Sequence, residues 1–319
     1  DAPVSEGEDV LAKYQKLYGG GEYYDDDDGG LDGFLTWDGP NGQTYRVADF
    51  ATDESWGPAY DPNILVLQFN AFDEWDEEHY LKPTPWVYPK NDYTYFFNTG
   101  VGYQNNIQIN GGNENGAFRA SYTNYQTTGI TPNSEMKRNT LSFSGIGKFG
   151  DMVDSWINAS FVSTEAKGRP ETGYGDRSPV QKMWQWIHTS VDYKDMSDYK
   201  NPDGTQRSWN RGSADDPVPL YTDNPYWSVY ENYQDDRRDR VFGNTGVNIK
   251  LAPWLKLTGR MGIDFYDLKM RERLAVGSQA TSEYSEQARS VFEKTLEAFF
   301  TADQRFSDDL IGLSAIIGT

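Results

Sequence analysis

Cysteine is absent from this 319-residue chain, and histidine occurs only twice, as His79 and His188. The absence of cysteine excludes a disulfide framework, a thiolate metal site and a cysteine nucleophile. Two histidines are too few for a histidine-rich metal site. Apolar runs of about 18 residues are also missing, and this excludes a transmembrane helix. The sequence therefore predicts no metal, no cofactor and no helical membrane anchor.

Positive charge is scarce as well. The net charge is −20, and 49 acidic residues face 29 Lys and Arg. Binding to nucleic acid requires a basic stripe, so a nucleic-acid partner is excluded. Residues 1–98 hold 21 of the acidic residues and only 5 basic ones. The run Asp25–Asp28 could hold Ca²⁺, but it lacks the EF-hand spacing, and a solvated acidic loop is the simpler interpretation.

Aromatic residues are abundant, at 15% of the chain, with 22 Tyr and 10 Trp. Tyr and Trp are amphipathic and favour interfaces. The mean hydropathy of −0.78 is typical of a water-soluble protein. Transmembrane β-barrels escape that rule because their lipid-facing residues occupy only every second position.

From residue 99 onward the hydrophobic pattern has a period of two. At 255–265 the odd positions carry Leu255, Leu257, Met261, Ile263 and Phe265, and polar residues lie between them. This alternation spans eleven residues, about the length that a tilted strand needs to cross a bilayer. The pattern recurs near residues 101–110, 118–123, 141–143, 157–161, 247–251, 296–300 and 311–315. We therefore expect eight strands.

The connections between these strands alternate between short and long. Short turns are expected at 111–116, 148–152, 252–253 and 303–309, and long connections at 127–137, 164–236 and 267–284. Short turns on one side and long loops on the other are typical of outer-membrane barrels. The pattern predicts an all-β fold: a segment of a transmembrane antiparallel up-and-down β-barrel with long extracellular loops. A soluble β-sandwich is the alternative, although its strands are usually shorter.

Several segments resemble one family of transporters. The segments KGRPETGYG (167–175), NPDGTQRSWN (201–210), DNPYWSVYENYQDDRRD (223–239) and AVGSQAT (275–281) are similar to SusC/RagA-type TonB-dependent transporters. YQKLYGG (14–20) and SWGP (55–58) look like the first extracellular loop of that family, and FFNTG (96–100) and GITPNSEMKR (129–138) resemble the strands that follow. The resemblance covers nearly the whole chain from about Leu11.

The resemblance implies a 22-stranded barrel that is closed by a plug domain, is energised by TonB–ExbB–ExbD and carries a SusD-like surface lipoprotein. Neither the plug nor a TonB box occurs in this sequence, residues Asp1–Asp9 show no signal peptide, and Leu310–Thr319 looks like an unfinished strand. We therefore expect a fragment of a larger protein. Residues 1–98 would form an extracellular loop region, and residues 99–319 would form barrel strands with a long extracellular loop at 164–236.

The long loop holds the candidate ligand-binding residues. Loops of about seventy residues are uncommon unless they are functional. Aromatic faces beside polar groups could stack on a sugar or a peptide and hydrogen-bond to it. The alternative is that the rings form the core of the loop or its contact with the lipoprotein. The candidates are Trp184, Trp186, Trp209, Asn210, Arg211, Tyr226, Trp227 and Tyr230.

The function that follows is import of a glycan or peptide oligomer across the bacterial outer membrane, and not catalysis. Outer-membrane lipid is expected as a further partner. Lipopolysaccharide phosphates could bind the basic residues near 237–240 and 269–273, but pairing of these residues with the chain's own acidic loops is the simpler interpretation. A glycosidase would need two carboxylates at a separation that a sequence does not reveal. A secreted carbohydrate-binding β-sandwich remains the rival among binding proteins.

Overall fold

The computed structural model describes residues 15–186, 188–306 and 311–319. The expectations for the N-terminal residues Asp1–Asp9, for Tyr14 and for the last part of the 303–309 turn lie outside the described residues. The chain divides into two compact units. The sheet unit comprises Thr99–Arg169, Gln234–Glu272 and Tyr284–Thr319, and the loop unit comprises the rest.

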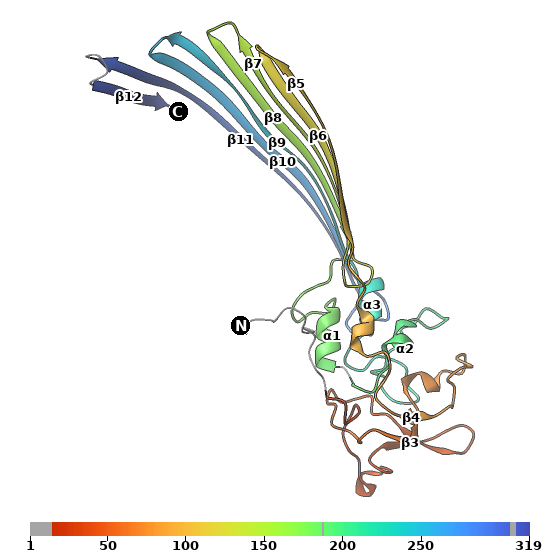
Figure 1. Cartoon of the computed structure of the whole chain (residues 1–319). Helices are drawn as coiled ribbons and strands as arrows, with labels where there is room; N and C mark the ends of the chain where they lie inside the picture. The colour runs from red at the N-terminus through yellow and green to blue at the C-terminus, as the bar shows by residue number, and fades with distance from the viewer. Residues whose placement is uncertain (1–14, 187, 307–310) are drawn as a thin grey trace. The chain divides into compact units, whose positions relative to one another are not determined.

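The sheet unit is a single sheet of eight strands. The strands follow one another across the sheet in chain order, from β5 to β12, so every neighbour in space is a neighbour in sequence (Figure 1). Their bounds are β5 Gly102–Asn113, β6 Gly116–Thr128, β7 Glu135–Phe149, β8 Val153–Lys167, β9 Gln234–Ala252, β10 Leu255–Leu274, β11 Glu283–Phe306 and β12 Ile311–Gly318. The predicted antiparallel up-and-down sheet of an all-β fold is confirmed.

The strands are longer than the hydrophobic pattern indicates. β11 contains 24 residues and continues to Phe306, so residues 303–306 belong to a strand and not to the expected turn. β5 and β6 similarly leave only residues 114 and 115 between them. The connection after β10 shrinks to 275–282, because charged side chains keep the alternation going through 267–274. The alternation of short and long connections is nevertheless present.

The loop unit is irregular by comparison. Its strands are β1 Leu35–Asp38, β2 Thr44–Val47, β3 Asp61–Val66 and β4 Thr84–Trp86, paired as β1 with β2 and β3 with β4. Its helices are the 3₁₀ turns η1 Asp26–Asp28, η2 Phe69–Phe72 and η3 Tyr93–Phe96, and the α-helices α1 Pro179–Trp186, α2 Tyr193–Ser197 and α3 Pro225–Tyr230. In the described part of the chain, no helix is long and apolar enough to cross a membrane.

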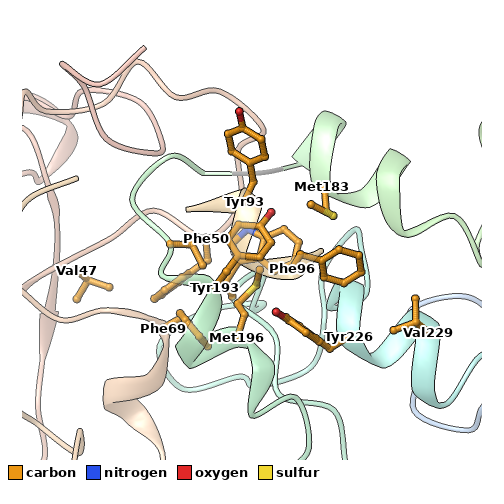
Figure 2. Close-up of a cluster of buried hydrophobic side chains, with 12 residues drawn as sticks. Val47, Phe50, Phe69, Tyr93, Phe96, Met183, Tyr193, Met196, Tyr226 and Val229 are labelled. Atoms are coloured by element: carbon orange, nitrogen blue, oxygen red, sulfur yellow. The ribbon is translucent and has the colours of Figure 1, made fainter. Parts of the chain in front are cut away.

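An aromatic core holds the loop unit together. Figure 2 shows that its side chains come from segments that are far apart in the sequence, among them Phe50, Phe96 and Tyr226. The rings of Phe96 and Tyr226 meet edge to face, with centroids 5.0 Å apart. Edge-to-face contacts of this kind stabilise aromatic cores beyond the area they bury. Residues 15–98 and 170–233 therefore share one core.

Three consecutive glycines allow the chain to pass close to this interior. A Cβ on Gly19 would lie 1.9 Å from the ring of Trp86, and one on Gly20 would lie 2.3 Å from His188. Gly21 has a φ of +89°, which favours glycine, and a Cβ there would meet Asp49. The YGG segment is thus fixed by close packing.

His188 is buried beneath Gly20. Its Nε2 atom lies 2.6 Å from the carbonyl oxygen of Thr52, so the neutral ring can donate a hydrogen bond there. Burial lowers the pKa of His188 because the charged imidazolium loses its hydration, and the nearby carboxylate of Asp49 only partly offsets this. The folded state therefore favours neutral His188.

This burial predicts a pH-dependent opening of the segment around His188. The pKa in the folded state lies below the unfolded value of 6.5, so the unfolded state binds the proton first and stability falls as the pH drops below about 6.5. Amide hydrogen exchange of Ser190 and Val191, corrected for intrinsic rates, should become faster between pH 8 and pH 5. The variant His188→Gln should lose this dependence. Equal pH dependence in both proteins would contradict the assignment.

Candidate functional site

The sheet unit has one apolar face. Strand register aligns the odd positions of β7, β8, β9 and β10, so that Leu141, Phe161, Val241 and Phe265 form one row across four strands. Ile107 and Tyr122 extend this face onto β5 and β6. These side chains are open to the surroundings: Ile107 is 71% exposed and Leu141 is 53% exposed. Such a continuous exposed apolar surface is unusual on a soluble domain.

The exposure of the apolar side chains distinguishes a single sheet, such as the wall of a barrel, from a β-sandwich of two stacked sheets. In a β-sandwich, the inward-facing residues are buried between two stacked sheets. Here Leu257 and Ile263 are half-buried and Met261 is exposed. The described residues of the sheet unit contain no second sheet. The apolar side chains of this unit are therefore not enclosed in a core of their own.

The opposite face of the same strands is polar. The register places on it nine polar or charged side chains: Gln104, Asn106, Arg119, Asn158, Asn248, Lys250, Lys256, Arg260 and Asp264. Many of these groups bond across strands. Arg119 donates to Gln108 at 2.7 Å, and Arg260 donates to Glu297 at 2.6 Å. The two faces differ in chemistry because the side-chain period of a strand is two.

The eight candidate ligand-binding residues fall into two groups in the loop unit. Five are buried, each exposed by 6% or less: Trp209, Asn210, Arg211, Tyr226 and Trp227. Three reach the surface: Trp184, Trp186 and Tyr230. Ligand binding by any of them stays a prediction. The surface that a ligand can reach is formed by the second group.

Two stacked aromatic pairs lie on this surface. The ring of Trp186, on α1, stacks on Tyr221 with centroids 5.3 Å apart and planes inclined by 20°. Tyr230, on α3, stacks on Tyr199 with centroids 5.4 Å apart and planes inclined by 7°. Trp184 meets Tyr93 edge to face. Each stack fixes its outer ring, which reduces the entropy lost when a ligand binds to it.

A buried ionic network holds the loop in place. Arg207 donates to Asp198 at 2.7 Å and pairs with Asp76, while Arg211 donates to Asp73 at 3.1 Å. Both arginine side chains are almost completely buried. Burial raises the pKa of Asp76, but hydrogen bonds from His79 and Arg207 outweigh it, so the pKa of Asp76 lies below its ordinary value. The network ties residues 73–76 to residues 198–211.

The side chains of Asn210 and Asn224 form hydrogen bonds with main-chain groups. The side chain of Asn210 donates to the carbonyl of Phe50 at 2.6 Å and accepts the amide hydrogens of Tyr221 and Thr222. Asn224 caps α3 by accepting from Tyr226, and it also donates to the carbonyls of Met196 and Arg207. These bonds satisfy polar groups in the interior of a long loop. The sequence signalled Asn210 as a binding residue and gave no sign of Asn224.

The AVGSQAT segment is clamped to α3 and to the residues around it. Asp223 accepts the amide hydrogen of Gln279 at 2.6 Å, and Asn232 accepts that of Ala275 at 2.8 Å. Trp227 donates to the hydroxyl of Ser278 at 2.8 Å. Gly277, with a φ of +94°, lies against the ring of Trp227. The burial of Trp227 thus reflects its contact with this segment.

Comparisons with known proteins give a match in fold. No family model and no curated protein matches the sequence. Among solved structures, the RagAB peptide importer in its open-open state aligns with a TM-score of 0.52 and 16% identity over 72% of this chain. A structure of the RagAB peptide transporter aligns with a TM-score of 0.50 and 16% identity, also over 72%. This chain has the fold of a segment of a RagAB chain. It spans 25% of the length of each matched chain.

The match confirms the resemblance in fold to RagA-type proteins that the motifs indicate. The matched proteins are a peptide importer and a peptide transporter. Among the described residues, no group of three or more His, Asp and Glu side chains is arranged to hold a metal ion.

The ionic network yields a prediction for Arg207. In Arg207→Met, Asp73 and Asp76 keep their buried charges without this partner, and a buried pair broken on one side typically costs about 3–5 kcal/mol. Local opening of residues 69–76, measured by amide hydrogen exchange, should become easier by about this amount. Arg237→Met removes an exposed pair with Asp239 and should change little. A small effect for Arg207→Met would show that the network is not needed for stability.

Proposed function

We propose that this chain forms part of the wall and outer vestibule of a TonB-dependent outer-membrane importer of the SusC/RagA type. The observation that carries the proposal is the two-faced sheet, apolar on one side and polar on the other over eight strands in chain order. Hydrocarbon would cover the apolar face, and water inside a pore would cover the polar face. A closed barrel leaves no unpaired backbone groups in lipid, so β5 and β12 would pair with further strands of a larger barrel.

The loop unit would form the vestibule on the cell surface. In this arrangement residues 1–98 and the long loop at 164–236 are extracellular, and a SusD-like lipoprotein closes over them. TonB would supply energy through a plug domain that this sequence does not contain. The substrate would be an oligomer of peptide or glycan, in keeping with the peptide importers that share the fold. Trp184, Trp186 and Tyr230 would present rings to that substrate.

The orientation of the sheet can be tested with single cysteines, because this chain contains none. Leu141 and Ser142 are neighbours on β7 and lie on opposite faces. In the complete natural polypeptide in outer-membrane vesicles, a membrane-impermeant maleimide that enters pores should label Ser142→Cys and leave Leu141→Cys unlabelled. Both positions should react after denaturation. Labelling of Leu141→Cys in the folded protein would overturn the membrane assignment.

The vestibule is tested by removing the aromatic stack. The double variant Trp186→Ala/Tyr221→Ala should lower ligand affinity by about fivefold, since one stacking contact between the ligand and the outer ring contributes about 1 kcal/mol. The matched control is Trp254→Ala, an exposed tryptophan in the short turn between β9 and β10. Affinity is measured by calorimetry with the ligand identified by mass spectrometry in the purified transporter–lipoprotein complex. Unchanged affinity in the double variant would exclude this surface from binding.

A further inference from the structure

A band of charged side chains borders the apolar face at the end that carries the long connections. Strand register aligns Lys137 on β7, Glu165 on β8, Arg237 on β9 and Lys269 on β10 in one row. These are odd positions, so the row lies on the same face as Leu141 and its apolar partners. The next row outward contains Glu135, Lys167, Asp235 and Arg271. We call these two rows the charged band.

Cations outnumber carboxylates in the charged band, by five to three, although the chain as a whole carries a charge of −20. Lys137, Lys167 and Lys269 make no side-chain hydrogen bond or ion pair with any described residue. Arg271 has only a long contact, 3.9 Å, with Glu286 of β11. The carboxylate of Asp235 already accepts the amide hydrogen of Gly168 at 2.9 Å. Three ammonium groups of the band are therefore available to an anion.

The row between the band and the apolar face consists of Asn139, Ser163, Asp239 and Asp267. The carboxylates of this row, Asp239 and Asp267, accept hydrogen bonds from neighbouring side chains. Asp239 accepts hydrogen bonds from Ser163 at 2.5 Å and from Arg237 at 3.0 Å, and Asp267 accepts one from Ser290. The ion pair with Arg237 offsets the charge of Asp239, and the hydroxyl of Ser290 occupies one acceptor oxygen of Asp267.

The band lies beyond the apolar face, toward the ends of the strands that carry the long connections. Lys137 lies four residues beyond Leu141 on β7. Four residues span about 13 Å along a strand, or about 10 Å along the membrane normal if the strand is tilted by about 40°. A lysine side chain is long and flexible, so its ammonium group can lie several ångströms from its Cα atom, at the level of the headgroups. If the row of Leu141 lies at the edge of the hydrocarbon, the ammonium groups lie in the layer just outside it, where lipid headgroups are found.

The band is confined to one end of the sheet. On the same face near the short turns, the corresponding row consists of Phe149, Val153, Ile249 and Leu257, without a charged residue. The band also borders an open cleft of about 370 Å³ on the described surface, lined by Lys137, Lys167, Arg237, Lys269 and Arg271 together with acidic neighbours. Ordinary solvation does not require such an asymmetry. A membrane whose two leaflets differ in headgroup charge would place anionic groups beside the band and not beside the row near the short turns.

We infer that the charged band binds the phosphate groups of a phosphorylated glycolipid in the outer leaflet, with the acyl chains of the lipid lying on the adjoining apolar face. This inference rests on the proposed function. The acyl chains would contact the apolar face, which adjoins the band. The phosphate groups would contact the three unpaired lysines and Arg237, whose positive charges complement theirs. The rival account is a lattice of cross-strand ion pairs that binds no lipid.

The test compares two double variants of the complete natural polypeptide. Lys137→Gln/Arg237→Gln removes two charges from the band, and Arg138→Gln/Arg238→Gln removes two charges from the opposite face of the same strands at neighbouring positions. Binding of fluorescent lipopolysaccharide to the detergent-solubilised protein is measured at low salt. Binding is also measured with dephosphorylated lipopolysaccharide, and with the phosphorylated lipid in the presence of competing inorganic phosphate.

The band variant should bind the phosphorylated lipid at least about tenfold more weakly, because each basic group near an anionic headgroup contributes roughly a fivefold factor in affinity. The opposite-face variant should bind like the unaltered protein, and the dephosphorylated lipid should bind poorly to all three. Equal loss in both variants, or no loss in either, would overturn the inference, as would full displacement of the lipid by inorganic phosphate alone.

The two proposals fail separately. If Leu141→Cys is protected from the maleimide but the band variant keeps full lipid binding, the apolar face does lie in lipid and the charged band does not bind phosphate. If Leu141→Cys is labelled, the apolar face does not lie in lipid and both fall. Folding of the band variant is checked by the protection of Leu141→Cys in the same background.

Discussion

The constraint on which the sheet unit depends is the pairing register. A shift of one residue between any two strands would turn every apolar side chain of one of them to the polar face. The alternation of apolar and polar residues in the sequence indicates which register buries or exposes each side chain. The short turns set the register at one end of each hairpin. It brings Leu141 of β7 and Phe265 of β10 into one row although more than one hundred residues separate them. The chemistry of both faces follows from this alignment.

The loop unit is organised by a different principle. Its strands are short, and much of its backbone is satisfied by buried polar side chains instead of by a sheet. Asn210, Asn224 and Asp223 each bind two or more groups from distant segments. Arg207 and Arg211 then add buried charge pairs, which lose stability steeply when one partner is removed. A loop of this length is therefore ordered by specific hydrogen bonds as much as by its aromatic core.

The sequence was sufficient for the sheet and insufficient for the loop unit. Alternation is local, so the eight strands and the order of short and long connections could be predicted from neighbours in the chain. The extension of β10 to Leu274 was missed because its last apolar residues, Leu268, Met270 and Leu274, fall at even positions, whereas the apolar residues of 255–265 fall at odd positions. In the loop unit, Trp209 and Trp227 look like ligand-binding rings in the sequence but are buried, whereas only one member of the stacked pair formed by half-buried Trp186 and exposed Tyr221 was identified. Burial there depends on contacts between distant segments, which composition does not encode.

The clamp on the AVGSQAT segment has a practical consequence for anyone who wishes to label this protein. A connection between two long strands would normally be chosen for an epitope tag or a fluorophore. Here the backbone amides of Ala275 and Gln279 are bound inside the loop unit, and Gly277 has a φ of +94°, which favours glycine. The turn at residues 202–205 is exposed and is a better point of insertion. The short segment that looks dispensable is thus the one that should be left intact.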